Sequence, residues 1–383
     1  MSKLDNLFCE LCPNGVEFKK VKELAEVSTG SSNRNESSDD GQYPFFVRSQ
    51  NIERMDSYEY DEEAIIIPGE GGVGDIFHYV NGKYALHQRV YRIHFTESTI
   101  DVRFAFYYFS AHFKPFIMKK AVTATVTSIR KPMIEDFMIP VPPLPVQREI
   151  VRILDNFTEL TAELTAELTA RKKQYEYYLE SLIVSCVDTQ KLMMSEICGI
   201  YDGTHQTPKY TGSGVKFVSV ENIDDLYGSK KFISEEAFSK YKIKPQLNDL
   251  LMTRITAGII GKCTIVDRNE PLAYYVSLAL LRPNSKVLDS RYLRYYIESG
   301  YGKKELRKYI LTDATPPKIN KDAIGKVSIL VPSLEEQRRV VKIIEKFDAM
   351  CNDLSSGLPA EIAARQKQYE YYRDKLLTFK VLA

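Results

Sequence analysis

The chain has 383 residues, and its 52 lysines and arginines nearly balance its 51 aspartates and glutamates, which leaves a formal net charge of +1. This length predicts more than one domain, and 44% hydrophobic residues suffice for ordinary buried cores. A nucleic-acid-binding protein that acts alone usually carries a basic excess, so the charge argues against that class. The sequence contains no run of about 18 apolar residues, so we expect no transmembrane helix.

The N-terminal segment predicts a protein that stays in the cytoplasm. The opening residues, MSKLDNLFCELCPNG, lack the long apolar stretch of a secretory signal. Six cysteines fit that compartment as reduced thiols. Cys9 and Cys12 are spaced as in a CxxC zinc motif, but no second such pair and no nearby histidine pair accompanies them. We therefore expect ordinary thiols and no metal site.

Residues 1–145 predict a first globular domain of mixed character, α/β or α+β. Its short apolar runs alternate with turn residues and are rich in aromatic and β-branched side chains, which is typical of strands. A helical stretch rich in Phe and Tyr, near Arg103–Lys119, interrupts the strands. The predicted strands lie within Tyr43–Val47, Ala64–Pro68, Tyr84–Phe95 and Phe137–Val141.

Residues 146–185 predict one long helix. Apolar residues recur at three- and four-residue steps, no glycine or proline falls inside, and Pro145 lies just ahead, where a helix tolerates it. From Gln147 to about Val184 such a helix would be roughly 57 Å long, so a second helix must cover its apolar stripe. Glu159–Ala170 is ELTA written three times. The repeat is a good helix former, and it is also an adjustable spacer, because one copy can be added or removed without ending the helix.

The second half of the chain repeats the first, with a second globular domain at 186–333 and a second helical segment at 334–383. The stretch QREIVRILDNF from Gln147 returns as QRRVVKIIEKF from Gln337, an offset of 190 residues (337 minus 147). Farther on, RKKQYEYYLESLI returns as RQKQYEYYRDKLL, and FFVRSQNI at 45–52 matches KFVSVENI at 216–223. A duplicated unit predicts a pseudo-two-fold molecule in which the two long helical segments pack together as a coiled coil.

The second helical segment is less regular than the first. Gly357 and Pro359 fall inside it, and proline both removes a backbone donor and clashes one turn back. We therefore predict a kink or break near Gly357–Pro359. The second segment also carries four more residues than the first between its two repeated motifs.

Catalytic motifs are weak in this sequence. Gly69–Gly74 (GEGGVG) satisfies GxGxxG, but a strand, a turn and another strand come after it, whereas a dinucleotide site needs a helix there. We interpret it as a glycine turn that lets backbone approach a ligand. The stretch ending at Lys262 has Thr256 where a P-loop requires glycine. The five histidines show no metal-ligand spacing, so the sequence does not support catalysis by this chain alone.

Several motifs together resemble the specificity (S) subunits of Type I restriction–modification systems. The resemblance lies in the edges of both globular domains and in both helices, and the interiors of the globular domains match no motif. The matching stretches are LCPNGVEFKKVKELAEV at 11–27, IPVPPLPVQREIV at 139–151, ILVPSLEEQRRVV at 329–341, the helix-end signals RKKQYEYY and RQKQYEYY, and the TAEL-type repeat.

The resemblance implies a non-catalytic DNA-recognition subunit. In such proteins two target recognition domains lie at opposite ends of an antiparallel helix pair, and each reads one half of a split double-stranded DNA site. The helices set the spacer between the half-sites and dock two methyltransferase (M) subunits, which methylate adenine N6. No cofactor is expected in this chain; S-adenosylmethionine, ATP and Mg are expected in the methyltransferase and restriction/translocase (R) subunits.

Candidate DNA-binding residues come from the polar loops of the two copies, because Arg, Lys, Asn, Gln, Ser and Thr contact base edges and phosphates. One pair of loops precedes the last strand of each domain, at Thr123–Lys131 and Thr315–Lys321. The candidates are Arg48, Gln50, Asn51, Thr125, Thr127, Ser128, Arg130 and Lys131 in the first copy, and Ser219, Asn222, Arg254, Thr315, Lys318, Asn320 and Lys321 in the second.

Alternatives remain open for several of these residues. Asn51 and Asn222 could instead cap turns after strands. In each of the pairs Tyr177–Tyr178 and Tyr371–Tyr372, one tyrosine is expected in the contact face between the helices, and the other, Tyr177 or Tyr371, is a candidate for partner docking.

Three other hypotheses about the function are compatible with this sequence. A symmetric coiled-coil scaffold without DNA contact is favoured by the small net charge. An enzyme that uses the glycine turn at 69–74 would bind a nucleotide and gain thermal stability from it. Within the resembled family, the chain could also serve a complex that methylates DNA without a nuclease subunit.

Overall fold

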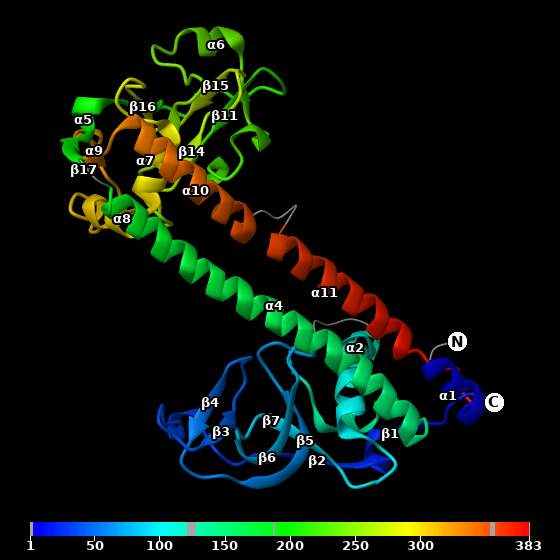
Figure 1. Ribbon diagram of the computed structural model, residues 1–383. Coiled ribbons are helices and arrows are strands. Elements are labelled where there is room, and N and C mark those ends of the chain that lie inside the picture. The colour runs from blue at the N-terminus through cyan, green and yellow to red at the C-terminus, as the bar shows by residue number, and fades with distance from the viewer. Residues whose placement is uncertain (1–2, 121–127, 187, 353–356, 383) are drawn as a thin grey trace. The chain divides into compact units, whose positions relative to one another are not determined.

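The computed structural model describes residues 3–120, 128–186, 188–352 and 357–382 (Figure 1). The chain divides into two compact units: the first comprises Met1–Leu164 together with Ile362–Ala383, and the second comprises Thr165–Glu361. Each unit therefore contains one globular domain and part of each helical segment. Because this division falls inside helices, the predicted domain limits at 145, 185 and 333 are not tested by it and stay predictions.

The first unit is built on a six-stranded sheet in the order β2-β7-β5-β6-β3-β4. Neighbouring strands are antiparallel except β3 and β6, which are parallel. The predicted apolar runs fall on strands, because β-branched and aromatic residues pack well on a half-buried sheet. The strands are β2 (Ala25–Thr29), β3 (Tyr43–Phe46), β4 (Ile52–Met55), β5 (Tyr60–Pro68), β6 (His78–Leu86) and β7 (Val90–Phe95).

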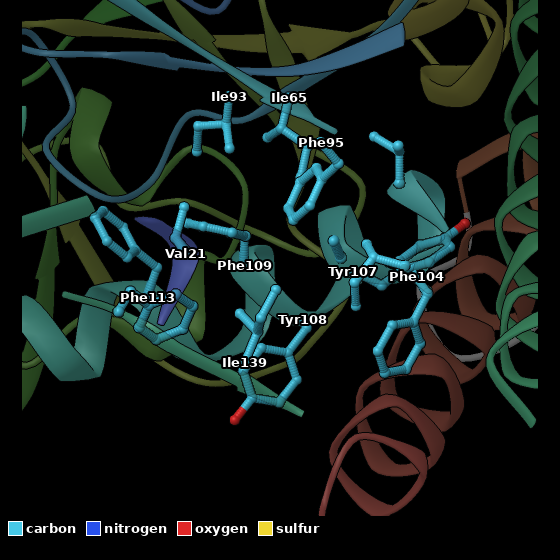
Figure 2. Close-up of a cluster of buried hydrophobic side chains, with 14 of the residues drawn as sticks. Val21, Ile65, Ile93, Phe95, Phe104, Tyr107, Tyr108, Phe109, Phe113 and Ile139 are labelled. Carbon is cyan, nitrogen blue, oxygen red and sulfur yellow. The ribbon is translucent and has the colours of Figure 1, made fainter. Parts of the chain in front are cut away.

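The core of the first domain lies between this sheet and helix α2 (Val102–Lys120). Figure 2 shows side chains of α2, among them Phe109 and Phe113, gathered with Ile65 and Ile93 of the sheet. All four are fully buried. Burial of each such side chain stabilises the fold by about 1.5–3 kcal/mol, so this aromatic helix anchors the sheet. The predicted helix near Arg103–Lys119 is confirmed.

Smaller elements complete the first unit. Strand β1 pairs antiparallel with β8, the last strand before the long helix. At the other end of the chain, Leu377 is buried in the same core, and Phe379 contacts Phe8 with ring centroids 6.0 Å apart. These elements are α1 (Lys3–Leu11), β1 (Phe18–Lys20), η1 (Val21–Glu23), η2 (Arg34–Glu36), α3 (Lys131–Glu135) and β8 (Met138–Pro140).

The second unit contains sheets ordered β10-β16-β13-β14 and β12-β11-β15, and a pair formed by β17 and β9. Its strands are β9 (Gln190–Met193), β10 (Cys198–Asp202), β11 (Val215–Val218), β12 (Phe232–Ile233), β13 (Leu250–Thr253), β14 (Cys263–Ile265), β15 (Leu272–Tyr274), β16 (Leu278–Pro283) and β17 (Ser328–Val331). Its helices are α5 (Met194–Ile197), η3 (Val220–Asn222), η4 (Leu226–Gly228), α6 (Glu235–Ser239), α7 (Ser290–Glu298), α8 (Gly300–Arg307), α9 (Lys321–Gly325) and α10 (Leu334–Asn352).

The two domains share one topology, which confirms the internal repeat. The order β2-β7-β5-β6 of the first domain corresponds to β10-β16-β13-β14 of the second, and the parallel pair β3–β6 corresponds to β11–β15. The difference is that the continuous strand β6 of the first domain is replaced by two short strands, β14 and β15. The fold is therefore a duplicated mixed α/β domain, as predicted.

Helix α4 (Leu144–Val184) forms the predicted long helix, in a single run of 41 residues. In the first unit Phe157 of α4 stacks on Tyr372 of α11 (Gly357–Leu376), with ring centroids 5.5 Å apart. In the second unit Tyr178 of α4 stacks on Phe347 of α10 at 5.4 Å. The partner's residue number falls as that of α4 rises, so α4 pairs antiparallel with α11 and α10. The same Phe–Tyr contact is made twice, as the repeat requires.

Helices α10 and α11 lie on either side of the place where the sequence predicts a kink or break. Helix α10 ends at Asn352 and α11 begins at Gly357, which has a φ of 76°. Pro359 is the third residue of α11, within the first turn, where proline is tolerated. Residues 353–356 lie outside the described part of the chain, so the kink itself stays a prediction.

A buried glutamine fixes the start of each helical segment. The Nε2 of Gln147 donates to the carbonyl oxygens of Thr99 (2.8 Å) and Pro142 (2.6 Å), and its Oε1 accepts from the backbone N–H of Asp101 (2.8 Å). Its equivalent, Gln337, makes the same set of contacts. These run from Nε2 to the carbonyls of Val287 and Pro332 and from the N–H of Asp289 to Oε1.

We expect Gln147→Met to lower the free energy of unfolding by about 3 kcal/mol, because it removes one buried and two partly buried hydrogen bonds to backbone groups, which cost roughly 1–3 kcal/mol each when left unsatisfied in the interior. Gln337→Met should cost a similar amount. The same substitution at exposed Gln174 on α4 is the control and should change stability by less than about 0.5 kcal/mol. Urea denaturation measures all three, and equal stability of the Gln147 and Gln174 variants would contradict the anchoring role.

Candidate nucleic-acid interface

In the first domain, loops from distant parts of the chain meet at one end of the sheet. The backbone N–H of Gly69, after β5, donates to the carbonyl of Arg89 (2.9 Å), and the N–H of Ile129 donates to the carbonyl of Gly69 (2.7 Å). The N–H of His87 donates to the carbonyl of Phe46 at the end of β3 (3.0 Å). We call this end, formed by residues 47–51, 69–74, 87–89 and 128–131, the loop edge of the first domain.

The second domain builds its loop edge with the same backbone hydrogen bonds. The N–H of Arg254 donates to the carbonyl of Ser277 (3.0 Å), that of Ile319 to the carbonyl of Arg254 (2.9 Å), and that of Tyr275 to the carbonyl of Val218 (2.9 Å). The loop edge of the second domain is formed by residues 219–222, 254–261, 275–277 and 315–321.

These equivalent bonds correct one detail of the sequence match. FFVRSQNI and KFVSVENI align Phe46 with Phe217, whereas the hydrogen bonds and the parallel strand pairs make Phe46 equivalent to Val218. Arg48 is therefore equivalent to Val220, one residue beyond the position that the sequence match gives. A shift of one residue in a strand moves side chains to the opposite face, so the sequence match pairs side chains that point in different directions.

The predicted residues of the first domain that the structure describes lie on its loop edge. Arg48, Gln50, Asn51 and Arg130 are exposed, and Ser128 is half-buried. At the turn that contains Asn51, the Ser49 hydroxyl donates to the Asn51 carbonyl (3.1 Å), and no described residue forms a hydrogen bond with the Asn51 side chain. Lys131 opens α3 and pairs with Glu135 at 3.5 Å. Thr125 and Thr127 lie outside the described residues.

In the second domain, the predicted loop before α9 is accessible. Thr315, Asn320 and Lys321 are exposed and Lys318 is half-buried. By contrast, Asn222 caps a turn: its Oδ1 accepts from the backbone N–H of Ser219 (3.2 Å), which confirms the turn-capping alternative for this residue.

Arg254 is a structural residue in the second domain. It is only 5% exposed, its Nε donates to the carbonyl of Val276 (2.8 Å), and its Nη1 forms an ion pair with Asp202 (2.9 Å). A buried guanidinium needs such partners, because an unpaired buried charge is strongly destabilising. Arg254 therefore ties β10, β13 and the loop before β16 together, and its guanidinium is turned into the domain.

Two arginines, Arg89 on the first loop edge and Arg34 beside it in η2, are not among the residues that the sequence predicted. Arg34 and Arg89 are exposed, and Arg34 pairs with Glu53 at 2.7 Å. The sequence analysis placed Arg89 inside one predicted strand, Tyr84–Phe95. The structure divides this run into β6, which ends at Leu86, and β7, which begins at Val90, with Arg89 in the tight connection between them. A hollow of about 230 Å³ opens at this edge; it is lined by Arg34, Val47, Arg48, Ser49, Gly71 and His87.

Glu70 lies between two of these arginines. Its carboxylate accepts from Nη1 of Arg89 (3.0 and 3.3 Å) and from Nη1 of Arg48 (3.1 Å), and these hydrogen bonds hold the pKa of Glu70 below its usual value. Burial and then the two arginines lower the pKa of His87, whose Nδ1 accepts from the N–H of Arg89 (3.0 Å). The edge therefore carries a charged Arg–Glu–Arg group beside a neutral imidazole near pH 7.

The glycine turn between β5 and β6 serves packing. Gly71 has a φ of 76°, and a Cβ there would lie 2.7 Å from the carbonyl oxygen of Arg48. The predicted glycine turn is thus confirmed, and the group that closely approaches it is the protein's own loop; the predicted approach to a ligand stays a prediction. Strand β6 comes after the turn, so the helix that would hold a pyrophosphate is missing from this described segment.

Within the described residues, no group of three or more His, Cys, Asp and Glu side chains could hold a metal ion. Cys9 and Cys12 are free thiols. No helix in the described part of the chain is long and apolar enough to cross a membrane.

Among the described residues, the most exposed aromatic side chains of the helical segments lie at equivalent places in the repeat. Tyr177 is 69% exposed and Tyr371 is 63% exposed. Their neighbours Tyr178 and Tyr372 make the stacks on Phe347 and Phe157 described above. One tyrosine of each pair thus belongs to the helix contact and the other faces outward, which agrees with the predicted division.

Comparison with known proteins gives a consistent set of similarities. The family model described as Type I restriction modification DNA specificity domain matches twice, over residues 13–171 and 189–364. A type I restriction enzyme specificity subunit of Haemophilus influenzae is 29% identical over 387 residues, covering 95% of this chain and 96% of that protein. The specificity subunit of an Escherichia coli type I restriction enzyme is 34% identical over 249 residues, covering 62% of this chain and 60% of its own length.

Among solved structures, the S subunit of a Type I restriction–modification system from M. genitalium is similar in fold, with a TM-score of 0.59 at 15% identity. The similarity covers 95% of this chain and 96% of that one.

Proposed function

Because the chain belongs to the family of Type I restriction modification DNA specificity domains, of which it carries two copies, we propose that each of its globular domains reads one half of a split double-stranded DNA site through its loop edge. The chain is a specificity subunit with two target recognition domains, the DNA-recognition component of a restriction–modification complex. The observation that carries the proposal is that one chain builds the same loop edge twice, from equivalent backbone hydrogen bonds.

The chemistry of the loop edges supports DNA contact. Exposed arginine, lysine, asparagine, glutamine and threonine side chains gather there, and these are the residue types that contact phosphates and base edges. A net charge of +1 is compatible with this, because a specificity subunit binds DNA within a complex, where other subunits add phosphate contacts. If the protein were a scaffold without DNA contact, nothing in that function would require two loop edges with these side chains.

The direct experiment maps methylated adenines in DNA from cells that carry this chain with its methyltransferase partner. We expect each methylated site to contain two short specified segments separated by an unread spacer of constant length. A single uninterrupted motif, or an unchanged methylation pattern when this chain is deleted, would overturn the proposal in favour of the scaffold function.

The loops before α3 and α9 allow phosphate contacts and base contacts to be separated. We expect Lys131→Ala and Lys321→Ala to weaken binding to all DNA sequences and to flatten the salt dependence, each by about one phosphate contact. Arg130→Ala should cost about 1–3 kcal/mol on the preferred site and relax one position of it. Salt titrations of DNA binding by the assembled complex measure this, with Lys172→Ala on α4 as the control. Unchanged binding in all three variants would remove these loops from the interface.

We propose further that the helical segments dock two methyltransferase subunits, with Tyr177 and Tyr371 at the two docking surfaces. Exposed aromatic side chains with a rigid neighbour are typical interface anchors, and the repeat places one on each segment. S-adenosylmethionine, ATP and Mg would then belong to the methyltransferase and restriction/translocase subunits.

Single and double variants of these tyrosines test the two docking surfaces. We expect Tyr177→Ala and Tyr371→Ala each to weaken one docking event by about 2 kcal/mol. Native mass spectrometry should then show complexes with one methyltransferase subunit for the single variants and none for the double variant. Stability should change by less than about 0.5 kcal/mol, because both side chains are exposed. Full assembly of the double variant would contradict the assignment.

A further inference from the structure

We propose that the two domains read their half-sites with different chemistry, and that the first reads guanine through Arg48 and Arg89, which Glu70 holds in place. This inference rests on the proposed function and assigns a base preference to one of its two half-sites. It comes from a comparison of the two loop edges, position by position.

The arginine pair is accessible and fixed at the same time. The side chains of Arg48 and Arg89 are 45% and 57% exposed, and that of Glu70, which lies between them, is 39% exposed. Each arginine uses Nη1 for Glu70, and among the described residues neither has a hydrogen-bond partner for Nε or Nη2. Nε and Nη2 of each guanidinium are therefore available, and these two nitrogens form an edge that can donate two parallel hydrogen bonds to one partner.

This arrangement suits a G·C base pair. Arginine bidentate to O6 and N7 of guanine is the commonest specific contact in the major groove, and a carboxylate accepts from N4 of cytosine. Glu70 also repels phosphate, so it directs the two arginines away from the DNA backbone and toward base edges. Because Glu70 already holds the arginines, less side-chain entropy is lost when they bind.

The second domain lacks these groups at the equivalent positions. The shared backbone hydrogen bonds make Val220 equivalent to Arg48 and Ser277 equivalent to Arg89, and the residue directly after Arg254, Ile255, is equivalent to Glu70. Ser277 is nearly buried and accepts through Oγ from the N–H of Val220 (3.4 Å).

The second loop edge therefore reads DNA with other groups. Arg254, the arginine at this edge, is turned inward to Asp202. Apart from Glu221, which pairs with Lys231 at 2.9 Å, the exposed polar side chains that remain there are hydroxyl, amide and ammonium groups, on Thr315, Asn320 and Lys321. These groups contact either phosphates or several different bases, so the paired arginine contact to guanine belongs to the first domain.

Lysine substitutions isolate the proposed contact, because they keep the charge and remove the planar guanidinium fork. The experiment measures binding of the full chain, assembled with its methyltransferase partner, to duplexes that carry the mapped site or one base-pair change in it. For Arg48→Lys and Arg89→Lys, we expect discrimination against replacing a G·C pair of the first half-site to fall about tenfold or more. Binding to unrelated DNA should stay within about twofold, and preference in the second half-site should not change.

Glu70→Gln gives a readout that a folding defect cannot imitate. We expect weaker discrimination at the same G·C pairs together with tighter, more salt-dependent binding to unrelated DNA, because a negative charge is lost beside two arginines. The matched control is Glu167→Gln on α4, which also removes a carboxylate paired with an arginine, at 2.6 Å from Arg171. It should leave both quantities unchanged.

The outcomes separate this inference from the proposed function. If the wild-type complex prefers both half-sites and the two lysine variants keep full discrimination in the first, the arginine pair is not the reader and the proposed function stands. The inference is also overturned if the lysine variants lose discrimination in the second half-site, or if the first half-site contains no G·C pair. If the wild-type complex shows no sequence preference, the proposed function itself fails.

Discussion

Exchange of residues 1–145 for the corresponding domain of another family member is expected to change one half of the recognised DNA site and to leave the other half intact. The physical reason is that each domain has its own sheet and its own core. Ile65, Ile93 and Phe109 belong to the core of the first, whereas Leu250, Leu281 and Tyr292 belong to that of the second. Backbone pairing of the strands is likewise complete within each domain.

The exchange must keep the contacts that hold the domain against the start of α4. Gln147 stays with the helix, and the incoming domain has to supply the carbonyl oxygens that Thr99 and Pro142 supply here. Methylation mapping of the hybrid measures the result, and the reciprocal exchange of residues 186–333 is the control, which should change the other half only. A change in both halves after either exchange would contradict the independence of the domains.

Deletion of one ELTA copy, Glu163–Ala166, is expected to shorten the unread spacer by one base pair, with two as the upper limit. Removing four helical residues shortens α4 by about 6 Å and rotates the C-terminal remainder of the helix by about 40°. B-form DNA turns by roughly 34–36° per base pair, so the rotation corresponds to about one pair. The axial change is nearer two pairs at about 3.4 Å each if the helix runs along the duplex.

The structure supports tolerance of this deletion. No side chain of the repeat is buried, and Leu160, Leu164 and Leu168 are half-buried. The hydroxyls of Thr161 and Thr169 donate to carbonyls four residues earlier in the same helix. One copy can therefore leave without opening the core, and Leu160 and Leu168 keep nearly the same face.

Methylation mapping checks the deletion as well, and insertion of one further ELTA copy is the matched control, which should lengthen the spacer by one pair. We expect both variants to recognise the original half-sites. Retention of the original spacer would contradict the proposal that the length of α4 sets the spacer. Altered half-sites would contradict the proposal that the helices set the spacer while the domains read the half-sites.

The sequence predicted the elements whose signals are local. The three- and four-residue apolar spacing predicted α4 to within two residues at either end, and runs of aromatic and β-branched residues marked β3, the end of β5, and β7. The repeated Gln–Arg motif also marked a structural device, because Gln147 and Gln337 anchor both helices. The sequence did not reveal which groups these glutamines bind, since their partners are backbone carbonyls.

The loop edges were harder to predict because their contacts join distant segments. Arg48, Glu70 and Arg89 lie in three separate loops, and no local pattern relates them. Arg254 was a reasonable candidate from its place beside a glycine turn, but the partner that turns it inward, Asp202, lies on another strand. Electrostatic pairing across a sheet therefore decided which arginine is available, and sequence spacing carries no information about it.

The central claim is that the loop edge of each domain faces one half of the DNA site, and directed cleavage of DNA tests it most directly. An iron chelate that cuts nearby DNA can be attached at Gln50→Cys or at Thr315→Cys, both exposed positions, in a chain whose exposed Cys9 is replaced by serine. In the complete complex, we predict that the first cuts in one half-site and the second cuts in the other. Cleavage of the same half by both, or of neither, would contradict this account.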